Sequence, residues 1–148
     1  MDLRRLRAGE WIAAAGGIVL IASLLLPWYE GPTETLTGYQ ALSVIDILLT
    51  LIALLGIALA VLQVTQDAPA KPVGAGILTI VFGALGVLLV VFRLIDSPDD
   101  GFEVRAGAWL GLVAVIGLTV GGWRSLAAEY VRGLPPDPEP ELRPTPAP

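Results

Sequence analysis

Four charged residues border long apolar stretches, where a charge is costly unless it has a partner or a function. Asp46 lies near the start of one apolar run, and Arg93 lies at the end of the next. Asp96 and Arg105 follow in the segment after that run. Carboxylates and guanidinium groups at such borders form ion pairs or handle protons and cations. Asp46, Arg93, Asp96 and Arg105 are therefore the candidate polar cluster of this sequence.

Two roles are open for Asp46. The stretch Ser43-Val-Ile-Asp46 has the capping-box form, in which Ser43 caps a helix and the acid reaches back to the Ser43 amide. Arg93, at a similar depth on the next antiparallel span, would pair with the carboxylate. We favour this structural role over the alternative, a titrating site that admits a proton or a cation. Glu10 lies at the opposite end of the spans, where we expect it to reach the interface.

Composition narrows the chemistry further. The chain of 148 residues contains no cysteine and no histidine, which removes thiolate, imidazole and the usual zinc or haem ligation. General acid–base catalysis needs paired groups in a pocket, and acids are available only near one face. We therefore predict no enzymatic activity, no cofactor and no metal. The net charge of −5 argues against nucleic-acid binding.

These charged groups must be positioned by membrane-spanning helices. Hydrophobic residues make up 55% of the chain, whereas only 16% are charged. A spanning helix needs about 20 mostly apolar residues. Four stretches meet this length, and breaks containing proline or glycine separate them: 10–28, 44–64, 73–94 and 106–124. The sequence predicts an all-α membrane protein, a four-helix transmembrane bundle.

The basic residues predict the orientation of this bundle. Seven of the nine lie before the first span, between the second and third, or after the fourth. Arg93 and Arg105 are the two exceptions. Because positive charge marks the cytoplasmic side, we expect both termini in the cytoplasm of a bacterial cell, with the bundle in its plasma membrane.

Small residues predict which helix faces pack. Projection of the fourth span at 100° per residue places Gly107 and Gly111 on one side and Trp109 and Trp123 on the other. Small residues let helix backbones approach closely inside lipid. The candidate packing positions are six glycines: Gly76, Gly83, Gly107, Gly111, Gly117 and Gly121. They serve packing within one chain, or else contact with a second copy or a protein partner. The tryptophans that bracket the first and last spans are predicted interfacial anchors: Trp11, Trp28, Trp109 and Trp123.

The C-terminal segment differs in composition from the rest. Seven of residues 132–148 are proline, so the sequence predicts a disordered cytoplasmic tail after a transmembrane domain at 1–131. Pro135-x-x-Pro138 is a candidate docking motif, although such patterns arise easily in proline-rich tails.

Five short motifs occur in order along the four spans: "LPWYE", "ALSVID", "RLID", "GAWLGL" and "GGWRS". In this arrangement the chain, over residues 9–124, resembles a family of short four-span integral membrane proteins of actinobacteria to which no activity is assigned. The resemblance implies a bacterial inner-membrane protein and nothing catalytic.

The sequence therefore predicts a non-enzymatic membrane protein whose main partner is the lipid bilayer. Its expected role is structural or accessory, or that of an interaction protein of the cell envelope. The alternative is a small transporter or channel subunit that uses the Asp/Arg cluster.

Overall fold

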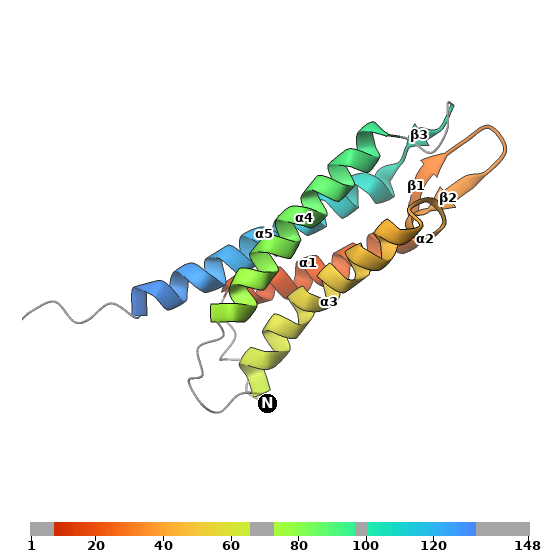
Figure 1. Ribbon diagram of the computed structural model, residues 1–148. Coiled ribbons are helices and arrows are strands. Elements are labelled where there is room, and N and C mark those ends of the chain that lie inside the picture. Colours follow the sequence, from red (N-terminus) through yellow and green to blue (C-terminus); the bar gives the residue numbers. More distant parts are fainter. Residues whose placement is uncertain (1–7, 66–72, 97–100, 133–148) are drawn as a thin grey trace, which may run out of the picture.

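A computed structural model describes residues 8–65, 73–96 and 101–132, and these form a helical bundle with a small sheet at one end (Figure 1). The long helices are α1 (Ala8–Leu25), α3 (Val44–Thr65), α4 (Val73–Ile95) and α5 (Ala106–Arg132). Each contains a segment of 18 to 23 residues that is long and apolar enough to cross a membrane. The four predicted spans are confirmed at this level. The predicted tail, apart from Arg132, lies outside the described residues.

Glycines lie where the helices pack most closely on one another. Helix α1 packs most extensively on α5, and α5 also packs on α4, whereas α3 packs mainly on α1 and less on α4. A Cβ atom added at Gly16 would lie 2.7 Å from the backbone nitrogen of Leu118, and one added at Gly9 would lie 2.6 Å from that of Ser125. Glycine therefore brings the backbones of α1 and α5 into contact, the expected means of association in lipid.

The outward faces of the bundle are apolar. On α5, Trp109 and Trp123 are more than half exposed, and Ile116 and Val120 lie on the same exposed side. Gly107, Gly111 and Gly121 are buried. The predicted division of the last span into a small-residue packing face and a tryptophan face is thus confirmed. The exposed side of α4 is also apolar, and its side chains include Val81, Phe82, Leu85, Leu88, Phe92 and Ile95.

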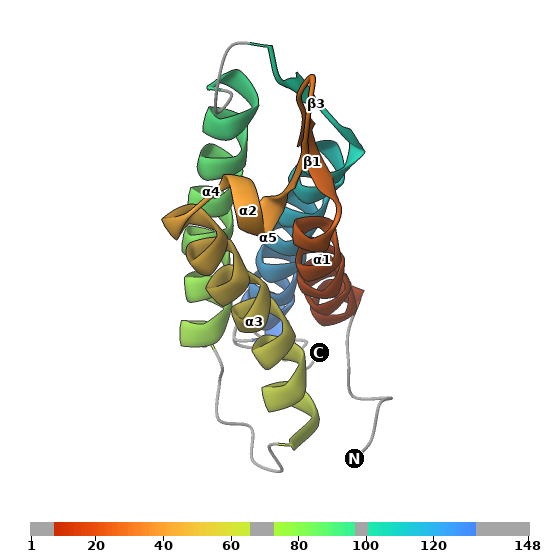
Figure 2. The same ribbon diagram turned by 90° about the vertical axis from the view of Figure 1, so that its right-hand side faces the viewer.

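The sheet is a feature that span prediction did not provide. Its order is β2-β1-β3, with β1 (Pro27–Glu30) paired antiparallel to β2 (Thr35–Thr37) and to β3 (Glu103–Val104). Strand β1 leaves α1, and β3 leads into α5, so one sheet joins two loops that are distant in the sequence (Figure 2). The first span accordingly ends at Leu25 and not at residue 28. A four-residue helix, α2 (Gly38–Ala41), connects β2 to α3.

Candidate functional site

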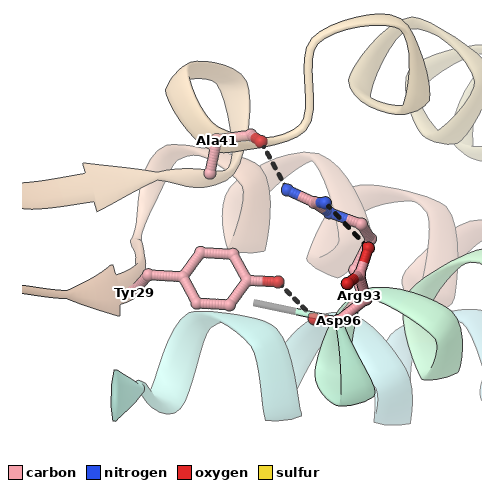
Figure 3. A network of polar contacts seen from close by, with 4 residues as sticks. All are labelled: Tyr29, Ala41, Arg93 and Asp96. Atoms are coloured by element: carbon pink, nitrogen blue, oxygen red, sulfur yellow. Dashed lines mark hydrogen bonds and ion pairs between the residues drawn. The ribbon is translucent and has the colours of Figure 1, made fainter. Parts of the chain in front are cut away.

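Arg93 lies at the centre of the polar contacts at the sheet-covered end. It belongs to the last turn of α4, and its side chain is only 14% exposed. Its Nη2 donates a hydrogen bond of 2.7 Å to the carbonyl oxygen of Ala41, the last residue of α2. Its Nη1 lies 4.0 Å from Oδ2 of Asp96. The guanidinium thus links the ends of two helices and one carboxylate (Figure 3).

Tyr29 completes the group from the sheet. The Tyr29 hydroxyl donates a hydrogen bond of 2.5 Å to the carbonyl oxygen of Arg93, and Cζ of Arg93 lies 5.9 Å from the centre of the tyrosine ring. The last four carbonyls of a helix lack partners within that helix, so the hydroxyl serves as a C-terminal cap for α4. Tyr29, Ala41, Arg93 and Asp96 are called the helix-end cluster below.

Burial strengthens the hold of Tyr29 on its proton. Removal from water raises the pKa of this phenol above its usual 10.0, the nearby Arg93 opposes that shift, and Asp96 adds to it. The hydroxyl therefore keeps its proton at neutral pH and remains a donor to the α4 carbonyl.

Asp46 does not join this cluster. It is half-buried in the first turn of α3, and its Oδ1 accepts a hydrogen bond of 2.6 Å from the amide of Ile47. Among the described residues no ion pair connects it to Arg93, which contradicts the expected pairing. The reason is that α2 intervenes between the sheet and α3, and its terminal carbonyl at Ala41 takes the guanidinium instead. The carboxylate still lies at a helix N-terminus, where negative charge is favourable.

Ser43 also departs from the predicted cap. Residue 43 precedes the first residue of α3, but its backbone has a φ of 51°, and its side chain is exposed and makes no hydrogen bond within the described part of the chain. A helix N-cap normally has extended backbone geometry. The capping-box contact occurs instead at α2, where the amide of Thr37 donates to Oε1 of Gln40 at 3.0 Å. The Thr-Gly-Tyr-Gln spacing was available in the sequence.

Arg105 forms a separate group at the edge of the sheet. Its Nε lies 2.6 Å from Oε2 of Glu30, and its Nη2 lies 3.7 Å from Oε2 of Glu103. Glu30 and Glu103 are opposed in the antiparallel pairing of β1 with β3, so the arginine lies between two like charges. The four predicted cluster residues are therefore divided: Arg93 with Asp96, Arg105 with the two glutamates, and Asp46 by itself.

The predicted packing glycines have different neighbours. Gly121 meets the backbone of Ala13 on α1, and Gly83 meets Thr119 on α5. A Cβ at Gly76 would lie 3.6 Å from Leu126, an ordinary contact. Gly107 packs on Pro27 and Trp28 of β1, and Gly111 packs on the Trp28 ring and on the Ser23 hydroxyl of α1. Within the described part of the chain, Gly117 has no atom within 4 Å of its added Cβ, so it packs on no neighbouring helix of this chain, and the alternative of a contact with a second copy stays a prediction.

Two side chains that the sequence analysis assigned to the membrane interface are buried in the structure. Trp28 was predicted as an interfacial anchor, yet it is fully buried and its Nε1 donates a hydrogen bond of 2.8 Å to the carbonyl of Ser23. Glu10 was expected to reach the interface, yet it is 1% exposed and accepts a hydrogen bond of 3.5 Å from the Ser125 hydroxyl. In the sequence, burial of these two side chains was indicated by small residues of α5, because small residues leave room for a large neighbour. These are Gly107 and Gly111 beside Trp28, and Ser125 beside Glu10.

The described residues contain no group of three acidic side chains arranged to hold a metal ion. No family model, curated protein or solved structure matches the chain. The resemblance to the four-span actinobacterial family therefore stays a prediction.

Proposed function

We propose that the protein is a non-enzymatic integral membrane protein with a structural or accessory role in a bacterial cell envelope. In this proposal the four long helices cross the plasma membrane, both termini lie in the cytoplasm, and the sheet lies on the outer side. The apolar outward faces of α4 and α5 and the distribution of arginine support this placement.

The helix-end cluster is the observation that carries the accessory role. The Arg93 guanidinium and the Tyr29 hydroxyl both donate to backbone carbonyls at helix ends, Ala41 and Arg93 itself. These two hydrogen bonds hold β1, α2 and α4 together. They fix the shape of the sheet-covered end, and a surface of fixed shape suits a protein that other envelope components contact.

The second candidate is a small transporter or channel subunit that uses Arg93 with Asp96 and Asp46. One observation favours it: the Arg93 Nε is buried and has no hydrogen-bond partner. Such an atom is costly unless an ion or water visits it. Ionisable groups inside membrane proteins commonly mark transport routes.

Proton flux into proteoliposomes separates the two candidates. We expect a pH-sensitive dye to report no flux for the wild type above protein-free vesicles, and none for Arg93→Gln or Asp46→Asn. Arg93→Gln should instead lower the free energy of unfolding by about 1.5–3 kcal/mol, because the charge-assisted hydrogen bond to the Ala41 carbonyl is lost. The exposed Arg124, changed to Gln, is the matched control and should leave stability unchanged.

A wild-type flux that Arg93→Gln or Asp46→Asn abolishes would favour the transporter instead. The accessory role has a positive readout of its own in affinity purification from native membranes. We expect the full chain to retain a partner protein, and comparison with a chain ending at Gly133 shows whether the proline-rich segment is needed.

A further inference from the structure

An open hollow of about 320 Å³ lies at the sheet-covered end, apart from the helix-end cluster. It forms where β1 leaves α1 and where α5 begins. Its lining consists of Leu26, Pro27, Glu30, Arg105, Ala106 and Gly107, and we call it the sheet-edge hollow. Four of these six residues are apolar or glycine, and the other two carry opposite charges.

The charges at the hollow can bind a group that carries both signs. Arg105 and Glu30 form a 2.6 Å ion pair, yet both side chains remain nearly half exposed. Glu103, on the neighbouring strand, is 77% exposed and lies 3.7 Å from the same guanidinium. One guanidinium therefore faces two carboxylates. A purely anionic ligand would be repelled by the excess carboxylate, whereas a zwitterion gives each charge a partner.

The apolar side chains beside the hollow indicate how the remainder of such a ligand would run. Ala106 lines the hollow, and Trp109 and Leu110, three and four residues later, share its face of α5. Trp109 is 57% exposed, and Leu110 and Leu26 are also exposed. These residues belong to or adjoin segments apolar enough to cross a membrane. A hydrocarbon chain lying along them would remain among apolar neighbours.

We propose that the sheet-edge hollow binds a phospholipid whose headgroup carries a primary ammonium, as in phosphatidylethanolamine. The lipid phosphate contacts Arg105, the ammonium donates hydrogen bonds to Glu30 and Glu103, and the acyl chains follow Leu26 and the exposed face of α5. A choline headgroup lacks the N–H donors for the carboxylates, and phosphatidylglycerol lacks the cation. The proposal does not depend on the accessory role and shares with it only the placement of the helices in a bilayer.

Native mass spectrometry of the detergent-purified full chain tests this site. The probes are phosphatidylethanolamine, phosphatidylcholine and phosphatidylglycerol with identical acyl chains. We expect the wild type to retain phosphatidylethanolamine about tenfold better than the other two, which corresponds to about 1.4 kcal/mol. Arg105→Gln and Glu30→Gln should each remove that preference, whereas Arg124→Gln, at the opposite end of α5, should preserve it.

Ala106→Leu tests the hollow itself, because this substitution changes its volume and leaves every charged side chain in place. The larger side chain occupies the hollow, so we expect retention of phosphatidylethanolamine to fall while the unfolding temperature stays at the wild-type value. Equal retention of the three lipids by the wild type, or a preference for phosphatidylglycerol, overturns the proposal. Displacement of the bound lipid by equimolar soluble phosphoethanolamine overturns it as well, because the ligand would then be a free zwitterion.

Discussion

The seam between α1 and α5 and the sheet-covered end are held together by different interactions. Along the seam, glycines place one helix backbone directly against another, as Gly9 and Gly121 do. At the sheet-covered end, side-chain donors reach carbonyl groups far away in the sequence. The Tyr29 hydroxyl bonds to Arg93, and the Arg93 guanidinium bonds to Ala41. The seam depends on the absence of side chains, whereas the end depends on particular polar ones.

The difference follows from what each region must satisfy. Inside the spans every backbone group can be bonded within its own helix, so only close packing remains to be gained. At helix ends the last carbonyls have no partner within the helix. The helix-end cluster supplies such partners to the carbonyls of Ala41 and Arg93. Substitutions should therefore destabilise the seam by overpacking, and the sheet-covered end by removing hydrogen-bond donors.

The largest effect is expected at the seam, for Gly121→Ala. The added Cβ would meet the backbone of Ala13, which cannot move aside as a flexible side chain can. We expect a loss of about 2–3 kcal/mol in the free energy of unfolding, the upper range for overpacking. Unfolding in mixed detergent micelles measures it.

Gly117→Ala is the matched control, because it lies in the same helix and in the same G-x-x-x-G pattern. No atom lies within 4 Å of the added Cβ, so this change should be neutral or should stabilise by up to about 1 kcal/mol. Equal losses at the two glycines would contradict the packing described for the seam.

This pair of glycines also marks a limit of sequence-based prediction. The four spans and the two faces of the last helix followed from hydrophobic length and helical periodicity. The spacing of Gly117 and Gly121 could not show which of them meets a neighbour, because that depends on where α1 crosses α5. Gly107 and Gly111 were likewise assigned to helix packing, although they accommodate β1 and the Trp28 ring.

A smaller effect is expected at the sheet-covered end, for Tyr29→Phe. The Arg93 carbonyl would lose its donor at a part-buried position, which costs about 1–3 kcal/mol. The exposed Tyr39, whose hydroxyl contacts Oγ1 of Thr50 at 3.1 Å, provides a control through Tyr39→Phe. If that control cost as much as Tyr29→Phe, the cap at the end of α4 would not be what stabilises this region.

The same substitution also gives a pH-dependent readout. Burial raises the pKa of Tyr29 above 10.0 in the folded protein, so the folded state holds the phenol proton more tightly than the unfolded chain. Stability from this group is fully present below about pH 10 and is lost as the pH rises through the folded-state pKa. Tyr29→Phe should remove this alkaline loss, and Tyr39→Phe should retain it.

The smallest effect, of opposite sign, is expected for Ser43→Gly. Ser43 has a φ of 51°, a left-handed conformation that glycine adopts without steric cost. Its side chain is exposed, and the helix begins here through a backbone hydrogen bond of 3.0 Å from the Ile45 amide to the Leu42 carbonyl. We expect thermal unfolding to show a gain of up to about 1 kcal/mol. A loss would restore a capping role to the serine hydroxyl.

The candidate site was predicted less well than the spans, for a physical reason. The charges of Arg93 and Asp96 and their positions at the end of one span correctly predicted that the two side chains lie close together. They could not place Asp46 relative to Arg93, because that depends on α2, a four-residue helix whose Ala41 carbonyl accepts the hydrogen bond of the Arg93 guanidinium. Strands of two to four residues, such as β3, are too short to show an alternating pattern. Trp28 was therefore assigned to an interface and Tyr29 received no role, although both are buried.

One sheet shared by two loops restricts how the chain can be inserted into a membrane. Strands β1 and β3 pair directly, and the amide of Arg105 donates to the carbonyl of Trp28 at 2.8 Å. The helical hairpin after residue 72 must therefore enter from the same leaflet as the one before it. All four helices can be inserted in either overall orientation. A form in which only one of the two helical hairpins is inverted would lose the pairing of β1 with β3.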